Sequence, residues 1–291
     1  MKLLKICKNK GNNPEESSAI LLAFPDNQGY NDRDFNLREI KNMNTQKLLS
    51  YTRKAIDEYR LIQDNDKIAV GISGGKDSLT LLVALANLRR FYPHPFSLEA
   101  ITVDLGNPGF ETDKIRSFCQ ELGVNYTCIQ TDIAKIIFEE RKEKNPCSLC
   151  AKMRKGALND AALELGCNKI AYAHHKDDLI ETMMMSLIFE GRINTFSPLT
   201  HLDRTGLYLI RPLIFVNEED IRGYAQGSHL PVTKSNCPAD GFTKREYTKE
   251  LLTKIYEENP GARDRMFGAI LNHNFDSWPK RIDRYEALRQ L

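Results

Sequence analysis

Along most of the chain, segments whose apolar residues recur at helical spacing alternate with short, nearly continuous apolar runs. Residues 45–59 carry apolar side chains at helical spacing, and from residue 67 short apolar runs take turns with amphipathic segments. Runs of this kind are typical of strands that are covered on both faces. Five strands are expected, near residues 67–73, 98–105, 125–130, 168–174 and 206–215. Because helical segments separate them, the pattern predicts a parallel sheet with right-handed crossovers.

Helix boundaries follow from capping residues and glycines. Gly123, Gly166 and Gly191 are expected to end three helices, and Asn217 to cap another that runs to Ala225. The helices are expected over 45–59, 77–91, 110–122, 147–165, 179–190, 217–225 and from Thr243 onward.

The first 44 residues interrupt this order, because they show no sustained period and are rich in Asn, Asp and Lys. We expect an irregular N-terminal appendage over 1–44 and one domain with C-terminal helices over 45–291. Neither a signal peptide nor a membrane span is evident, so a cytoplasmic protein without a membrane partner is expected. With 41 basic and 39 acidic side chains among 291 residues, RNA binding would need a local basic patch.

A glycine-containing loop follows the first expected strand. Ser73-Gly74-Gly75-Lys76-Asp77-Ser78 lies between that strand and its helix, where ligands bind in open parallel sheets. The glycines allow close approach to an anion, the helix start offers N–H donors, and Ser73, Ser78 and Lys76 add hydroxyl and ammonium donors. The Walker A spacing is absent.

This loop resembles the PP-loop of ATP pyrophosphatases, which cleave ATP between the α- and β-phosphates and transfer AMP to a carbonyl oxygen. The resemblance implies an adenine-nucleotide α-hydrolase-like fold with a five-stranded parallel sheet and flanking helices, and ATP bound by residues 73–78. It also implies that Asp104 contacts the adenosine and that Arg211 closes the same site. A solvated strand end is the alternative for Asp104.

Seven cysteines, an odd number, and no export signal argue against a disulfide framework and favour metal or redox chemistry for close pairs. Cys147 and Cys150 stand three apart at a helix start, where their pKa is expected to fall. The pair alone fits zinc, an iron–sulfur cluster, a redox disulfide or packing. Cys237, in a loop after the last strand, is a candidate third ligand.

The order of SGGKDS, PCSLCAKMRKGAL, GCNKIAYAHHKDDLIET, IRPL and a late cysteine resembles the tRNA 2-thiocytidine synthetases over about residues 45 to 275. This resemblance implies a [4Fe–4S] cluster on Cys147, Cys150 and Cys237. The chain departs from the family at Lys234, where a C-x-x-C motif commonly has its first cysteine. The first 44 residues match no known pattern.

Charged residues near both motifs are further candidates. Asp177 and Asp178 begin a helix after the fourth strand, where they suit Mg²⁺ on ATP, proton transfer on the base, or helix capping alone. His174 is a candidate nucleotide-binding residue, and a packed histidine at a strand end is the alternative. Arg154, one helical turn from Cys150, is a candidate catalytic residue by resemblance to related thiolases, and a solvated helix face is the alternative. Lys76 in the loop is a further candidate catalytic residue.

The expected reaction is ATP-dependent tRNA thiolation at the C2 oxygen of a cytidine in the anticodon loop. A cysteine desulfurase or another persulfide donor is the expected sulfur partner, and the sequence leaves open whether the enzyme is a homodimer. The alternatives are 2-thiouridine synthesis on tRNA, an adenylating ligase without sulfur transfer, and a nucleotide-binding protein without turnover.

Overall fold

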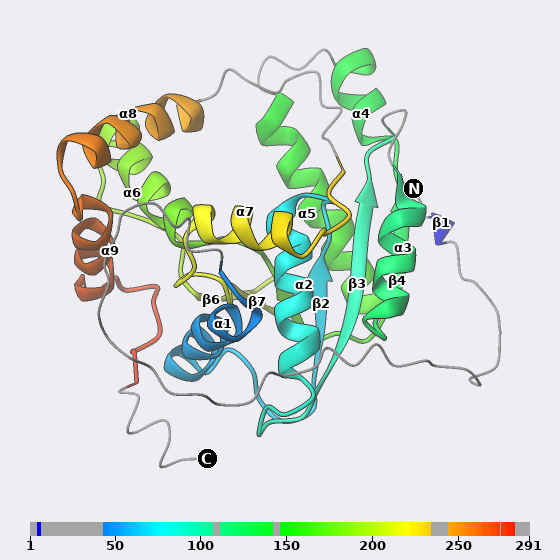
Figure 1. Cartoon of the computed structure of the whole chain (residues 1–291). Coiled ribbons are helices and arrows are strands. Elements are labelled where there is room, and N and C mark those ends of the chain that lie inside the picture. Colours follow the sequence, from blue (N-terminus) through cyan, green and yellow to red (C-terminus); the bar gives the residue numbers. More distant parts are fainter. Residues whose placement is uncertain are drawn as a thin grey trace.

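The computed structural model describes residues 5–6, 43–106, 111–141, 146–233, 244–273 and 275–282 (Figure 1). Its strands are β1 (Lys5–Ile6), β2 (Asp66–Gly71), β3 (Phe96–Asp104), β4 (Asn125–Gln130), β5 (Lys169–Ala171), β6 (Leu199–Leu202) and β7 (Leu207–Ile210). Its α-helices are α1 (Thr45–Tyr59), α2 (Lys76–Leu88), α3 (Thr112–Glu121), α4 (Ile133–Lys135), α5 (Pro146–Glu164), α6 (Lys176–Glu190), α7 (Glu218–Gly227), α8 (Lys244–Glu258) and α9 (Ala262–Asn272). A π-helical turn, Ile136–Glu140, follows α4.

The sheet has the strand order β1-β4-β3-β2-β5-β7-β6. β4, β3, β2, β5 and β7 are parallel, which confirms the five expected strands and the α/β fold class. The sequence did not predict the edge strands β1 and β6, both antiparallel to their neighbours. From β2 the chain proceeds outward to β3 and β4, then returns to the other side of β2 for β5 and β7. The strand order therefore reverses between β2 and β5.

Helices cover both faces of this sheet. Ile68 and Val70 of β2 pack into a core shared with α1, α2, α3 and α7, whereas Ala69 between them packs against α5 on the opposite face. This alternation is the side-chain period of a strand. Figure 1 shows α1, α2, α3 and α7 in front of the sheet and α5 behind it. α2 is buried on nearly every side, which fixes the loop that precedes it.

The C-terminal helices α8 and α9 do not extend the sheet but pack against α6 (Figure 1). They confirm the helices expected after Thr243. This arrangement brings a segment from the end of the chain to the first turn of α6, which follows β5. Side chains of α8 and α9 can therefore reach the carboxyl edge of the sheet.

Most of the expected helix ends are confirmed. α1 spans the expected residues and is capped by Asn44, whose side chain accepts from the N–H of Lys47. Gly191 ends α6 with a φ of 63°. The expectation for Asn217 was wrong in one respect: it stands at the N-cap of α7 but makes no side-chain capping bond, because its amide instead donates to Asp220.

The N-terminal appendage stays a prediction, because residues 7–42 lie outside the described part of the chain and only β1 is placed. Among the described helices, none is long and apolar enough to cross a membrane.

Candidate nucleotide site at the carboxyl edge of the sheet

The loop over residues 73–78 lies where the strand order reverses, beyond the carboxyl end of β2 and at the start of α2. His174 and His175 follow the neighbouring strand β5. In open α/β sheets this reversal point is where ligands bind, because the loops from adjacent strands diverge there and leave a crevice. The expected position of the loop is thus confirmed.

Two serines hold the loop in shape. Ser78 Oγ donates to the carbonyl oxygen of Gly75 at 2.9 Å and accepts from the backbone N–H of Ser73 at 3.2 Å. Ser73 Oγ accepts from the N–H of Gly75 at 3.3 Å. These bonds curl the backbone around the start of α2, whose first N–H groups and positive dipole end favour an anion.

Gly74 has a φ of +80°, a left-handed conformation that favours glycine. Its carbonyl oxygen accepts from the backbone N–H of Thr233 at 2.9 Å. A Cβ atom at Gly74 would lie only 2.1 Å from Thr233 Oγ1. The glycine is therefore required both by the turn and by the close approach of a second chain segment.

Lys76 does not extend into solvent. Its ammonium group lies 3.0 Å from Asp77 Oδ1 and 3.1 Å from Oε1 of Glu218, the first residue of α7. Glu218 also pairs with Lys249 of α8 at 2.9 Å. The phosphate loop is thus joined to α7 and, through Glu218, to a C-terminal helix.

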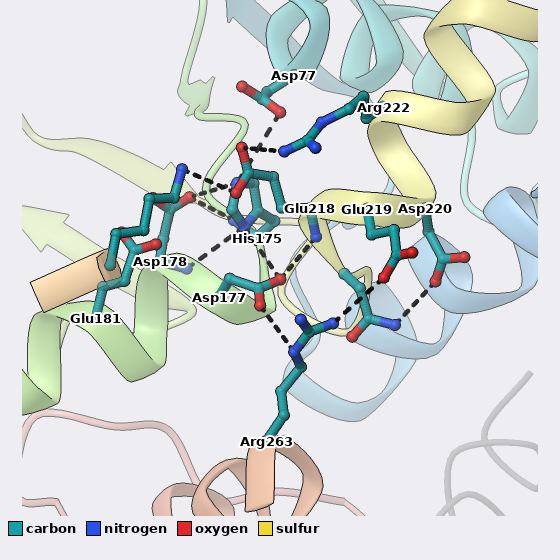
Figure 2. Close-up of polar contacts among 12 residues, drawn as sticks. Asp77, His175, Asp177, Asp178, Glu181, Glu218, Glu219, Asp220, Arg222 and Arg263 are labelled. Carbon is teal, nitrogen blue, oxygen red and sulfur yellow. Dashed lines mark hydrogen bonds and ion pairs between the residues drawn. The ribbon is translucent and has the colours of Figure 1, made fainter. Parts of the chain in front are cut away.

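The first turn of α6 faces this loop (Figure 2). His175 and Asp178 form a reciprocal capping box, and Asp178 also pairs with Arg245 of α8 at 2.9 Å. The ring of His175 is buried, and its Nε2 lies 3.9 Å from Asp77 Oδ1. The two segments that the sequence singled out therefore meet through His175 and Asp77.

Asp177 uses both oxygens of its carboxylate within the protein. Oδ2 accepts from the backbone N–H of Glu218 at 2.7 Å, and Oδ1 lies 3.3 Å from Nε of Arg263 in α9. Figure 2 shows Asp177 between these two partners. Asp177 thereby caps α7 from another helix. This geometry supports a positioning role and leaves its expected catalytic role a prediction.

Arg211 and His174 form a buried pair after β7 and β5. Nε of Arg211 donates to Nδ1 of His174 at 3.2 Å, and the guanidinium also donates to Ser197 and Thr200 and lies over the ring of Phe196. Burial and the Arg211 charge lower the pKa of His174 to about 4. His174 is therefore neutral at pH 7 and leaves its Nε2–H as a donor.

Asp104 ends β3, on the other side of the phosphate loop from Arg211. Its Oδ1 accepts from the N–H of Gly106 at 2.9 Å, which shapes the turn after the strand. Both residues thus lie at the expected edge of the sheet, where they flank the loop. Their contacts with a nucleotide remain predictions.

Cys147 and Cys150 lie in the first turn of α5, as expected, with Cys147 exposed and Cys150 half-buried. Cys237 lies outside the described residues. Among the described side chains, no three His, Cys, Asp or Glu form a metal-binding group. A metal site at this pair would need a further ligand, and the expectation that Cys237 provides it stays a prediction.

The N-terminal half of α5 projects beyond the sheet. No residue from Pro146 to Ala157 is buried, whereas Leu158 packs on β2, where its Cδ2 would lie 3.1 Å from a Cβ at Gly71. At 1.5 Å per residue, Cys147 stands about 16 Å further along the helix than Leu158. Arg154 is exposed on this half. Burial raises the pKa of Tyr172 after β5, and the charges of Arg211 and Arg154 oppose this rise only in part.

Sequence reasoning missed the basic residues of the C-terminal helices. Arg245, Lys249 and Arg263 reach acidic side chains at the starts of α6 and α7. No motif marks them, because their role depends on how α8 and α9 pack. The acidic run at 218–220 was the one available signal, since such residues favour a helix start.

Comparisons with known proteins agree with this site. A family model described as a PP-loop domain matches residues 42–253. A tRNA-cytidine(32) 2-sulfurtransferase from Geobacter sulfurreducens is 38% identical over 80% of this chain and 92% of its own length. One from Pelobacter propionicus is 40% identical over 75% and 82%, respectively. The U34-tRNA thiolase NcsA from Methanococcus maripaludis, solved with its [4Fe–4S] cluster, has a TM-score of 0.64 and 26% identity over 79% of this chain and 81% of that chain. The chain therefore belongs to the PP-loop domain family and, within it, to the family of the tRNA-cytidine(32) 2-sulfurtransferases.

Proposed function

We propose that this protein is an ATP-dependent tRNA sulfurtransferase that replaces the C2 oxygen of a cytidine in the anticodon loop with sulfur. The observation that carries the proposal is the serine-braced loop at the start of α2, with Lys76 beside it, in a chain of this family. Such a loop provides what cleavage of ATP to AMP and pyrophosphate needs, namely N–H donors and one ammonium group near the leaving phosphates.

ATP binds with its β- and γ-phosphates on residues 73–78. Asp104 and the Arg211–His174 pair flank the loop and hold the adenosine and the α-phosphate. Because His174 is neutral, it contributes a hydrogen bond and no charge, while Arg211 contributes the positive charge. Burial fixes this pair before the substrate arrives, so little order is lost on binding.

Mg²⁺ accompanies the ATP phosphates. Asp177 and Asp178 are poor ligands for it, because their carboxylate oxygens already bind groups of the protein. Asp77 is the more accessible carboxylate, since its side chain is 32% exposed in the first turn of α2, and its oxygens, which lie 3.0 and 3.1 Å from Lys76, would be shared between Lys76 and the ion. Carboxylate oxygen is a suitable ligand for this ion. Asp177 instead fixes the start of α7.

Cys147, Cys150 and Cys237 would hold a [4Fe–4S] cluster. The two described cysteines fit this role, because both stand on one helical turn, with Cys147 exposed and Cys150 half-buried. When bound, a cluster with three protein ligands supplies an iron with an open position for sulfur.

The reaction has two balanced steps. The C2 oxygen of the cytidine attacks the α-phosphorus, the bond from that phosphorus to the bridging oxygen breaks, and pyrophosphate leaves. Sulfur at the oxidation level of sulfide then adds to C2, and the C2–O bond breaks with AMP as the leaving group. A cysteine desulfurase or another persulfide donor supplies the sulfur, and two thiols supply the two electrons that reduce the outer persulfide sulfur to sulfide as they form a disulfide. Arg154, exposed on the same helix as the cysteines, stabilises charge during the second step.

A second candidate function is 2-thiouridine synthesis, because the thiolase NcsA is named for position U34 of tRNA and shares the fold. Its identity is 26%, against 38% to 40% for the two cytidine enzymes above, and this difference favours cytidine.

Mass spectrometry of tRNA nucleosides from cells with and without the gene tests the proposal. We expect 2-thiocytidine to disappear on deletion and to return with the wild-type gene but not with a Lys76→Ala variant. Loss of 2-thiouridine alone would select the second candidate. Unchanged thionucleosides together with tRNA-dependent exchange of pyrophosphate into ATP would indicate an adenylating ligase instead.

A further inference from the structure

The carboxylate of Glu218 pairs with three cationic side chains at the site. Glu218 lies outside the sequence motifs by which this chain resembles its family. Glu218 Oε1 lies 3.6 Å from Arg222 (Figure 2). The same oxygen lies 3.1 Å from Lys76, and Oε2 lies 2.9 Å from Lys249. Its side chain is only 15% exposed. Its own backbone N–H donates to Asp177, so both the main chain and the side chain of Glu218 are fixed.

The pairing gives Lys76 a defined position. A lysine side chain has four rotatable bonds, and holding it in one place costs conformational entropy. Here Asp77 on α2 and Glu218 on α7 hold the ammonium from two sides. α7 packs against α2 and carries Glu218 on its first turn, so the direction of the second contact is set by helix packing.

Two carboxylates would by themselves outweigh the charge of Lys76 and leave one net negative charge. Lys249 and Arg222 prevent this, because three cations and two carboxylates leave one net positive charge in the group. Burial opposes ionisation of Glu218, but hydrogen bonds and charges from Lys249 and Lys76 outweigh it and lower its pKa to about 2. Glu218 therefore stays ionised at neutral pH, and the group as a whole still attracts an anion.

We propose that Glu218 is a positioning residue that holds the Lys76 ammonium at the start of α2, ready for the departing pyrophosphate, and that Lys249 of α8 anchors it. This role rests on the proposed adenylating function for its catalytic part. Helix α8 thereby contributes to the site, because its Lys249 contacts Glu218, and Glu218 contacts Lys76 of the phosphate loop.

Pyrophosphate binding to the full-length protein separates this role from simple electrostatics. If Glu218 were only a negative charge near an anion site, Glu218→Gln would tighten pyrophosphate binding. If it positions Lys76, the same variant should weaken binding by about tenfold, on the order of one charge-assisted hydrogen bond. Calorimetry with inorganic pyrophosphate measures the sign directly. The matched control is Glu219→Gln, next along α7, whose carboxylate is 79% exposed and 3.9 Å from Arg263.

A double variant tests whether Glu218 acts through Lys76. Adding Glu218→Gln to Lys76→Met should cause no further loss of pyrophosphate affinity, because the residue to be positioned is gone. In tRNA-dependent exchange of pyrophosphate into ATP, Glu218→Gln should lower kcat while KM for ATP changes little. A further loss in the double variant would show an independent role.

Glu218→Asp covers the case in which Glu218→Gln fails to fold. It keeps the charge but shortens the side chain by one methylene, so a positioning role predicts weaker pyrophosphate binding and a charge role predicts wild-type binding. Wild-type or tighter binding in the variants that fold would overturn the proposal. Absence of tRNA-dependent exchange in the wild-type protein would instead count against the proposed function, and the binding result would still stand.

Discussion

The backbone N–H of Thr233 donates to the carbonyl oxygen of Gly74 at 2.9 Å, which joins the phosphate loop to the segment that leads toward Cys237. Thr233 Oγ1 is buried against the same glycine and makes no hydrogen bond to the described residues. The loop over residues 73–78 and the segment that leads toward Cys237 are therefore in direct contact at Thr233. Space at this contact is available only because residue 74 has no side chain.

Gly74→Ala should consequently disable the phosphate loop. A left-handed φ of +80° costs an alanine roughly 1–2 kcal/mol, and its Cβ would also meet Thr233 Oγ1 at 2.1 Å. We expect ATP affinity to fall by at least about tenfold and the free energy of unfolding to decrease, as measured by calorimetry and urea titration.

The control is Gly156→Ala in α5, where no atom lies within 4 Å of the new Cβ. It should leave ATP affinity unchanged and raise stability by about 0.5–1 kcal/mol. Wild-type ATP affinity in Gly74→Ala would contradict the assigned contact.

The strands of the sheet could be predicted because a short, contiguous stretch of sequence is enough to recognise each of them. The central strands are almost uniformly apolar since both faces are covered, as in β2, and the loop after it carries a recognisable motif. β6 was not predicted because its sequence, LTHL, is short and half-exposed. Its pairing with β7 is set by the turn between the two strands.

The polar contacts of the site could not be predicted in the same way. Asp177 caps α7 from a different helix, and Lys249 reaches Glu218 from α8. These partners lie 41 and 31 residues apart in sequence, and only the packing of α6, α7 and α8 brings them together. The sequence therefore identified Asp177 and Asp178 at a helix start and left magnesium binding, proton transfer and helix capping open, but it could not show that Asp177 caps α7.

The neutral state of His174 should appear in the pH dependence of stability. Its folded pKa of about 4 lies below the unfolded value near 6.5, so below pH 6.5 the unfolded chain binds a proton that the folded chain does not. Stability from this residue is complete above pH 6.5 and is lost as the pH falls toward 4. The loss between pH 7 and pH 5 should be about 2 kcal/mol at most.

His174→Asn isolates this contribution. Asparagine does not titrate, and its carbonyl oxygen can still accept from Arg211, so the variant should lose less stability than the wild type between pH 7 and pH 5. Urea titrations of both proteins at the two pH values give the difference, in which the titration of shared carboxylates cancels. Equal losses in the two proteins would show that His174 has the same pKa in the folded and unfolded states, which would contradict the lowered value.

The cysteines of α5 should bind iron, whereas the buried cysteines should not. Cys119 and Cys167 are shielded in the core, and burial raises the pKa of their thiols to about 12 and 11. Protein purified without oxygen should be brown and contain iron and sulfide in comparable amounts. Cys147→Ser, Cys150→Ser and Cys237→Ser should lose both, while Cys119→Ala and Cys167→Ala should keep them. Zinc as the sole metal at full occupancy would contradict the cluster.

The projecting half of α5 should contribute to tRNA binding. With a net charge of only +2, the chain needs a local patch, and from Pro146 to Leu158 this helix carries Lys152, Arg154 and Lys155 but no acidic residue. Lys152 and Lys155 are both exposed. Such a surface neutralises phosphates and releases counterions, so each lysine that binds the RNA backbone adds to the salt dependence of binding.

Replacing both lysines by glutamine should weaken tRNA binding and flatten its dependence on salt. The slope of the logarithm of the affinity against the logarithm of the salt concentration should fall by about 0.7 to 0.9 for each phosphate that is no longer neutralised. ATP affinity without tRNA should stay the same, because the phosphate loop is a separate element.

Lys114→Gln is the control, since Lys114 is exposed on α3 and lies 2.6 Å from Glu111. A lower affinity with an unchanged slope would mean that the lysines act through the shape of α5, and an unchanged affinity would place the tRNA on another surface. The expected pattern would set the anticodon loop beside the helix that carries Cys147 and Cys150, which is where a cytidine must lie to receive sulfur after adenylation.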